Sequence, residues 1–303
     1  MVSRSFPVTG APGGPSPRAI TLLVALLCLI WGSTWLVIRE GLVALPPFLA
    51  AAMRFSVASA LMFGVARWLS VREGGSRPPL RLVLVMGGFN FALSYGVVYW
   101  VEQTLPSALT SVLWGVYPLI AALISHVYLP GERIGRTQAI GFLLGFLGVL
   151  LLFLTDVPRI GGRALLSALI LLVSPLVVAI ATAVVKRHGQ GVSSLRLNRD
   201  SMALGALLLW CAALIFERDR PAEWTGPAIF SVIYLAVAGT VVTFGIFFWL
   251  LRFAPAFKLA VVPFITPAVA LLLGYFIGGE SIGVSTLFGL GLILLGVLAV
   301  TRG

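Results

Sequence analysis

Residues 99–118, YWVEQTLPSALTSVLWGVYP, return in altered form as residues 248–267, FWLLRFAPAFKLAVVPFITP. The similarity continues beyond both stretches, with the offset falling from 149 to 148 residues after a one-residue deletion. The matched pairs are Trp100 and Trp249, Pro106 and Pro255, Pro118 and Pro267, Glu132 and Glu280, Ile134 and Ile282, Gly141 and Gly289, and Gly148 and Gly296. Both copies lie among apolar segments, which predicts a duplicated bundle of membrane helices.

The composition agrees with a membrane protein. Hydrophobic residues make up 59% of the chain and charged residues only 10%, with a mean hydropathy of +1.07. Because a helix rises about 1.5 Å per residue, crossing a hydrocarbon core takes roughly 20 apolar residues. Ten segments meet this length: 21–40, 47–69, 80–101, 105–128, 137–155, 164–186, 197–216, 227–251, 255–277 and 284–301. We therefore predict an all-α integral membrane protein with ten transmembrane helices, preceded by a disordered tail at residues 1–20.

The net charge of +11 is spread over the ends of these segments and forms no continuous patch, which argues against nucleic-acid binding. With the N-terminus placed inside, fifteen basic residues fall in inside loops and termini and five in outside loops. Such a bias follows the positive-inside rule. Both termini are therefore predicted to be cytoplasmic, in the inner membrane of a bacterium.

Each copy of the repeat carries five spans, at residues 21–155 and 156–303. Because five is odd, the two copies are predicted to have opposite orientations in the membrane. Inverted repeats of this kind are typical of secondary transporters, whose substrate site lies between the halves. Glu132 and Glu280 fall at tight turns, where acidic side chains favour helix N-termini, and a capping role is expected for both.

Several motifs resemble those of one known family. Trp31-Gly32-Ser33, Arg54-Phe55, the run Tyr99–Leu109 with Pro118, and Gly131-Glu132-Arg133 are similar to the signatures of the EamA family of the drug/metabolite transporter superfamily. The similarity covers the chain after residue 20, although the sixth span has Val178-Ala179 where the first has Trp31-Gly32. The resemblance implies a ten-helix inverted-repeat carrier with a central cavity lined mainly by the third, fourth, eighth and ninth helices. It also implies export of amino acids or related metabolites.

The third span and its partner, the eighth, are rich in aromatic side chains, and a polar-tipped aromatic cavity suits amphipathic solutes. The residues expected to contact substrate are Tyr95, Tyr99, Asn90, Tyr117, Trp31, Trp35, Trp114, Phe244 and Phe248. Tyrosine and tryptophan are also enriched at membrane interfaces. A structural belt is therefore an equal alternative for Tyr99, near a helix end, and a packing stripe is the alternative for Trp31 and Trp35.

Arg54 belongs to one half only, because the matching position of the other half is Ser201. A guanidinium inside a span is costly and usually faces the bundle interior. One hypothesis is that it binds a substrate carboxylate through two hydrogen bonds. The alternative, which we prefer from the sequence, is pairing with carbonyl groups or snorkelling to the interface.

Proline inside a helix removes a hydrogen bond and bends the helix. Pro118 and Pro267 occupy matching positions, and Pro263 adds a further break. These prolines are predicted to act as hinges, with plain packing geometry as the alternative. Gly141, Gly145 and Gly148 allow close helix contact, expected inside the monomer rather than in a dimer.

Some features of other mechanisms are missing. The sequence holds no G-x-x-x-x-G-K-[ST] motif for ATP, no catalytic or metal-ligand constellation, and no sign of a cofactor. No Asp or Glu falls in the middle of a predicted span, which favours gradient-driven facilitation over proton coupling. The titratable candidates for proton coupling are Glu102, near the predicted mouth of the cavity, and His126, near the inner end of the fourth span. Both are expected to be solvated helix-end residues.

We therefore predict a monomeric carrier in the lipid bilayer that exports small amphipathic metabolites, chiefly amino acids including aromatic ones, by alternating access. A proton-coupled drug or metabolite exporter of the same fold is the first alternative. A channel-like or receptor membrane protein without a transport cycle is the second.

Overall fold

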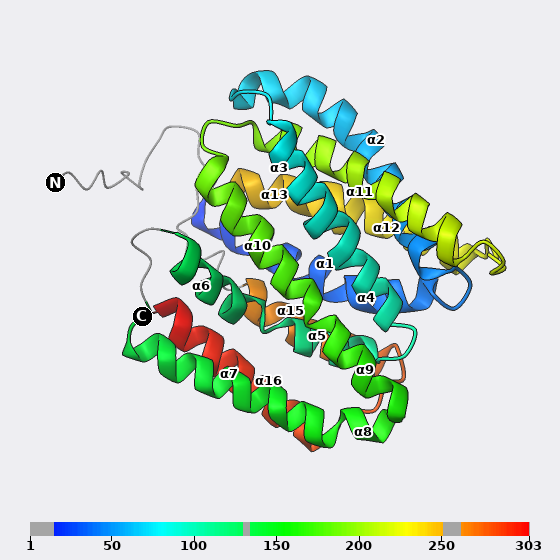
Figure 1. Ribbon diagram of the computed structural model, residues 1–303, viewed down its shortest axis with the longest axis vertical. Helices are drawn as coiled ribbons and strands as arrows, with labels where there is room; N and C mark the ends of the chain where they lie inside the picture. Colours follow the sequence, from blue (N-terminus) through cyan, green and yellow to red (C-terminus); the bar gives the residue numbers. More distant parts are fainter. Residues whose placement is uncertain (1–14, 130–133, 251–261, 303) are drawn as a thin grey trace.

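The computed structural model describes residues 15–129, 134–250 and 262–302. These residues are helical apart from short connections and one isolated bridge between Ser76 and Val192. Figure 1 shows the helices as rods packed side by side along the molecule. Eight helical stretches are each long and apolar enough to cross a membrane, and two shorter apolar helices cover Ile265–Phe276 and Val284–Ala299. The chain is thus an all-helical, multi-pass membrane protein.

The elements follow one another in a simple order. They are α1 (Pro17–Gly41), α2 (Pro47–Glu73), α3 (Leu80–Val85), the π-helical segment η1 (Met86–Ser94), α4 (Tyr95–Val101), α5 (Ser107–Trp114), α6 (Tyr117–Tyr128), α7 (Arg136–Thr155), α8 (Val157–Ile160), α9 (Gly162–Leu171), α10 (Val173–His188), α11 (Ser194–Phe216), α12 (Gly226–Ala236), the π-helical segment η2 (Val237–Val242), α13 (Thr243–Leu250), α15 (Val262–Phe276) and α16 (Val284–Arg302).

The predicted segments overlap these helices, although the first part of the ninth, 255–261, lies outside the described residues. Helix α1 begins at Pro17, four residues before the predicted start of the first span at residue 21. The Ser16 side chain caps this helix by accepting a hydrogen bond from the amide of Ala19 at 3.2 Å, and proline suits the first helical position. The rest of the predicted tail, residues 1–14, lies outside the described residues.

Four of the predicted spans are interrupted. The third runs through α3, η1 and α4, and the eighth through α12, η2 and α13. Shifting η1 by the repeat offset of 149 residues places it over η2. π-Helical turns widen the helix and occur frequently at functional sites. The fourth span breaks between α5 and α6, and the sixth breaks at Leu172 between α9 and α10.

Two carboxylates cap the N-termini of helices that are distant from them in the sequence. Glu280 accepts hydrogen bonds from the amides of Ser107 and Ala108 at 2.8 and 2.9 Å, at the start of α5. Glu217 does the same for Phe48 and Leu49 of α2, both at 2.9 Å. Acidic groups stabilise helix N-termini because they satisfy free amides and complement the helix dipole. The capping role predicted for Glu280 is confirmed, and Glu132 lies outside the described residues.

Helices α7 and α16 form a close pair along one edge of the molecule, green and red in Figure 1. Their glycines face each other. A Cβ atom on Gly148 would lie 2.7 Å from the carbonyl oxygen of Gly289, and one on Gly296 would lie 2.5 Å from that of Gly141. The small-residue face of α7 is therefore occupied by α16 of the same chain, as expected for internal packing.

Candidate functional site

Arg54 on α2 joins the two halves of the chain. Its side chain is 2% exposed. Both Nε and Nη2 donate to the hydroxyl oxygen of Thr240 at 3.2 Å, and longer contacts of 3.5 Å reach the Tyr99 hydroxyl and the Gly239 carbonyl. The Thr240 hydroxyl in turn donates to the Leu235 carbonyl at 2.8 Å. The π-helical segment η2 thus presents both a hydroxyl and a carbonyl to the guanidinium.

Aromatic rings surround the guanidinium. Its Cζ atom lies 4.8 Å from the ring centre of Tyr95 and 5.3 Å from that of Phe55. Cation–π contacts at these distances stabilise a cation where water is excluded. The rings of Phe55 and Tyr95 pack edge to face with centres 4.7 Å apart, and Phe55 also contacts Phe91 at 5.4 Å.

This aromatic wall extends to the second half of the chain. Phe91 on η1 lies 6.4 Å from Phe244 on α13, measured between ring centres, and Phe244 lies 6.1 Å from Trp31 on α1. We call Arg54 with Phe55, Phe91, Tyr95, Tyr99, Thr240, Phe244 and Trp31 the arginine cluster.

A second group lies around Trp114 at the end of α5. The Trp114 indole stacks on the Tyr117 ring with centres 5.1 Å apart, and Trp35 lies 6.1 Å away. The indole N–H donates to the Ser174 hydroxyl at 2.9 Å, which also pairs with Ser94 at 2.8 Å. These contacts tie α5 and η1 of the first half to α10 of the second.

The structure separates the predicted substrate residues into these two groups. Five of them, Arg54, Tyr95, Tyr99, Phe244 and Trp31, belong to the arginine cluster. Trp35, Trp114 and Tyr117 form the other group, in which the Tyr117 hydroxyl reaches Thr182 at 3.4 Å. Asn90 is half-buried in η1. Phe248 lies on α13, but its side chain is outside the described part of the structure.

The burial of Tyr99 and Arg54 bears on the alternatives considered for them. Tyr99 is only 1% exposed and packs inside the bundle, so it is not part of an interfacial belt. Arg54 is buried and does not snorkel outward, but the pairing with a carbonyl group that was the other half of its alternative is confirmed, because Nη2 donates to the Gly239 carbonyl. Thr240 is not among the predicted residues, because it lies 186 residues from Arg54 and a single threonine in an apolar span gives no sequence pattern that indicates a contact.

The break between α5 and α6 lies against a predicted hinge proline. A Cβ atom on Gly115 would lie 3.4 Å from Cγ of Pro267, which is inside α15. Pro118 occupies one of the first two positions of α6, where its missing N–H breaks no helical hydrogen bond. It therefore starts a new helix after the break instead of bending a continuous one. Pro263 is the second residue of α15, and its side chain lies outside the described residues.

Glu102, the residue after α4, differs from its prediction. It is 3% exposed, and neither carboxylate oxygen has a hydrogen-bond partner among the described residues. Burial and the nearby Glu280 raise the pKa of Glu102 well above its ordinary value, against the attraction of Arg39 and Arg54. The expectation of a solvated helix end is therefore wrong: the chain buries a titratable group within electrostatic reach of Arg54 and of the ion pair of Arg39 with Glu280.

Comparison with known proteins places this arrangement among membrane transporters. The model of the EamA-like transporter family matches residues 18–154 and 165–302. The uncharacterized transporter YoaV of Bacillus subtilis is 28% identical over 92% of this chain and 95% of its own length. The uncharacterized inner membrane transporter YedA of Escherichia coli is 27% identical over 91% and 89%. A solved crystal structure with 21% identity superposes with a TM-score of 0.65, covering 95% of this chain and 98% of its own.

Proposed function

Since the chain belongs to the EamA-like transporter family and is a membrane transporter, we propose that it exports small amphipathic metabolites, namely amino acids and aromatic ones among them. Export proceeds by alternating access in this proposal, through ten spans arranged as two inverted repeats. Both termini face the cytoplasm, and the working unit is a monomer in the inner membrane. The observation that carries the substrate class is the buried guanidinium of Arg54 within a wall of aromatic rings.

The electrostatics of Arg54 favour an anionic group on the substrate. Among the described residues it forms no ion pair, and two of its four hydrogen bonds are at the 3.5 Å limit. An uncompensated buried charge is costly, whereas a carboxylate can accept two parallel hydrogen bonds from a guanidinium. A substrate carboxylate would therefore find a prepared partner at Arg54. The neighbouring rings of Tyr95, Phe55 and Phe91 offer an apolar surface for the rest of the molecule.

The interruptions of the helices support a conformational cycle. Arg54 binds η2, the aromatic wall includes η1, and the α5–α6 break rests on Pro267. These irregular backbone segments lie where the two halves meet, and a change of their hydrogen bonds would move one half relative to the other. Discontinuous helices at the junction of repeats are a common way to build such a site.

A panel of matched solutes in proteoliposomes tests the proposal. We would compare counterflow of phenylalanine with that of its amide and of phenethylamine, which keep the ring but lack the carboxylate. We expect saturable counterflow of the acid and at least tenfold slower transport of the other two, because a charge-assisted hydrogen bond contributes about 1.5–3 kcal/mol. Equal rates for the three would remove Arg54 as a carboxylate site, and the absence of saturable counterflow for every amino acid would overturn the transporter mechanism proposed.

A proton-coupled exporter of the same fold is a second candidate, favoured by Glu102. Its buried carboxyl has no hydrogen-bond partner among the described residues, and burial raises its pKa, so it would hold a proton more tightly in this conformation than when the cycle exposes it. Uptake into proteoliposomes with and without an imposed pH gradient separates the two candidates. Acceleration by the gradient that is lost in Glu102→Gln would establish coupling through this group, whereas identical rates would establish facilitation.

A further inference from the structure

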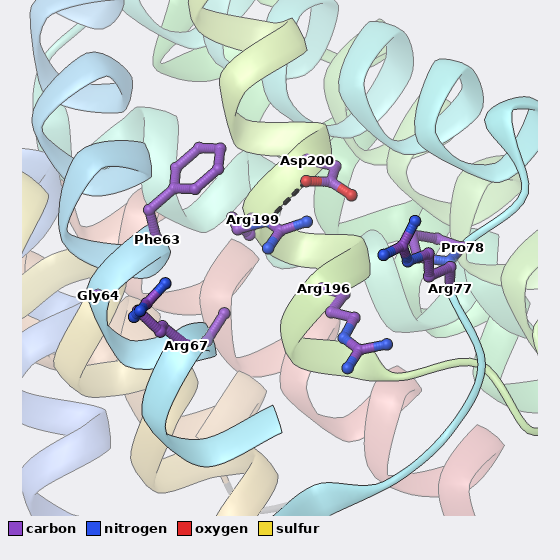
Figure 2. A pocket seen from close by; sticks show the side chains of 9 residues that line it. Phe63, Gly64, Arg67, Arg77, Pro78, Arg196, Arg199 and Asp200 are labelled. Atoms are coloured by element: carbon purple, nitrogen blue, oxygen red, sulfur yellow. Dashed lines mark hydrogen bonds and ion pairs between the residues drawn. The ribbon is translucent and has the colours of Figure 1, made fainter. Parts of the chain in front are cut away.

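A basic pocket lies at the end of the molecule opposite the carboxylate caps. It has a volume of about 740 Å³ and is formed by the end of α2, the segment between α2 and α3, and the start of α11. Figure 2 shows the side chains that line it, from these three parts of the chain. They are Phe63, Gly64, Ala66, Arg67, Arg77, Pro78, Arg196, Arg199 and Asp200.

Positive charge dominates this pocket. Four arginines line it, against the single carboxylate of Asp200, which pairs with Arg199 at 2.7 Å. Among the described residues, Arg67, Arg77 and Arg196 have no acidic partner. Three uncompensated guanidinium groups around one cavity form a site for an anion with several acceptor oxygens, since each guanidinium can donate two parallel hydrogen bonds.

The rim of the pocket has an apolar side as well. Phe63 is 51% exposed and lies four residues before Arg67, so both lie on one face of α2. The guanidinium of Arg199 covers the Phe63 ring, with its Cζ atom 4.8 Å from the ring centre. Phe63 lies one turn deeper in the membrane-spanning part of α2 than Arg67. The pocket thus has arginines at the end of the apolar stretch of α2 and an aromatic edge, Phe63, within that stretch.

We propose that this pocket binds the phosphate headgroup of an anionic phospholipid, whose acyl chains pass along Phe63. Basic pockets between transmembrane helices bind such headgroups. The exposed Phe63 favours a lipid over a free phosphate, because a small inorganic anion gains nothing from an aromatic edge. The lipid would bridge α2 of the first half and α11 of the second. The connections next to these helices already meet here, because the amide of Ser76, after α2, donates to the carbonyl of Gly191, before α11, at 2.7 Å.

Lipid binding to the purified full-length protein tests the proposal directly. Phosphatidylglycerol would be titrated into the protein in an uncharged detergent, and binding measured by native mass spectrometry and by the shift of the melting temperature. Phosphatidylcholine, inorganic phosphate and glycerophosphoglycerol serve as comparison ligands. We expect saturable binding of phosphatidylglycerol, at least tenfold tighter than that of phosphatidylcholine or of either chain-free phosphate.

Two charge-matched double variants distinguish binding in the pocket from the general electrostatic attraction of an anionic lipid to a basic protein. Arg67→Gln/Arg196→Gln removes two positive charges from the pocket, and Arg163→Gln/Arg218→Gln removes two exposed charges from the opposite end. Each arginine near an anionic lipid contributes roughly a fivefold gain in affinity. The pocket variant should therefore bind about 25-fold more weakly and the control like the wild type.

Three outcomes would overturn the proposal. These are equal losses in both double variants, no loss in either, or binding of inorganic phosphate as tight as that of the lipid. Phe63→Ser provides a further check that keeps every charge, and it should weaken lipid binding without changing the weak binding of glycerophosphoglycerol.

Discussion

Single side chains determine what the arginine cluster can recognise. The guanidinium of Arg54 is held by the Thr240 hydroxyl at 3.2 Å and by the faces of two rings, so its position does not depend on a substrate. Its charge, however, is balanced by no carboxylate within ion-pair distance among the described residues. Glu280, which has a counterpart in the other repeat, caps a helix, whereas Arg54 occurs in one half only and is the residue that we propose binds the substrate.

Replacing Arg54 should abolish selectivity for the carboxylate without unfolding the protein. For Arg54→Gln we expect counterflow of phenylalanine to fall about 10- to 100-fold, while the slow rate for its amide stays the same. Loss of a buried charge that has no ionic partner should leave the melting temperature within a few degrees. Arg163→Gln, which removes an exposed charge, is the control. An equal fall for acid and amide would indicate a structural role only.

Tyr95 should act through its ring and not through its hydroxyl. Its ring face lies against the guanidinium, and no hydrogen bond of its hydroxyl is seen in the described structure. Tyr95→Phe should therefore transport like the wild type, whereas Tyr95→Leu should raise KM about 3- to 30-fold, as expected for the loss of a cation–π contact. Kinetics of counterflow would measure both, and a defect in Tyr95→Phe equal to that in Tyr95→Leu would contradict the assignment.

Glu102 should make the thermal stability of the protein depend on pH. Because burial raises the pKa of this carboxyl, the folded conformation binds its proton more tightly than the unfolded chain does. The resulting stabilisation is complete below the unfolded pKa and is lost as pH rises through the folded pKa. The melting temperature of the wild type should thus fall with rising pH more steeply than that of Glu102→Gln. Parallel pH profiles for the two proteins would show that another group is responsible.

At the scale of helices, two kinds of element meet in this molecule. The pair of α7 and α16 is regular and packed through facing glycines. The elements around Arg54 and Trp114 are broken or widened: η1, η2, the α5–α6 break and the α9–α10 break. Regular helices give a stable frame, and widened turns offer carbonyls and hydroxyls that can change partners. The irregular elements are therefore where we place the motion of the transport cycle.

The close contact of α7 and α16 makes a clear prediction for two glycines. A Cβ on Gly148 would lie 2.7 Å from a backbone carbonyl of α16, whereas one on Gly291 would meet nothing within 4 Å. Gly148→Ala should destabilise the protein by about 1–3 kcal/mol through overpacking. Gly291→Ala should stabilise it by up to about 1 kcal/mol, because alanine favours helix. Thermal unfolding in detergent would measure both, and a similar change in the two variants would contradict the packing described.

At the scale of the whole molecule, the membrane spans could be predicted from the sequence, but the contacts between distant side chains could not. The spans were predictable because a stretch of about 20 mainly apolar residues is typical of a transmembrane helix. Helix α2, for example, begins at Pro47 as expected. The pairing of Arg54 with Thr240 was not, because it joins residues 186 positions apart through a helical turn that leaves no periodic pattern. Glu102 was misjudged because a charged residue at a helix end is usually solvated, and only the packing of distant helices buries it.

The orientation of the molecule in the membrane is a prediction for the whole chain. A variant with Cys28→Ala and Cys211→Ala would carry a single new cysteine at one exposed arginine, either Arg163→Cys or Arg136→Cys. If the basic end faces the cytoplasm, an impermeant maleimide should label position 163 in intact cells and position 136 only after permeabilisation. The reverse pattern would invert the proposed topology.

The contact between Arg54 and Thr240 also bears on the origin of the protein. Arg54 comes from the first copy of the repeat and Thr240 from the second, so neither copy contains the complete cluster. A symmetric dimer of two first copies would bury two guanidinium groups, and a dimer of two second copies would bury none, because Ser201 stands at the matching position. The single chain, with two different copies, carries one such charge. The two halves expressed as separate chains should therefore restore transport only when both are present in one cell.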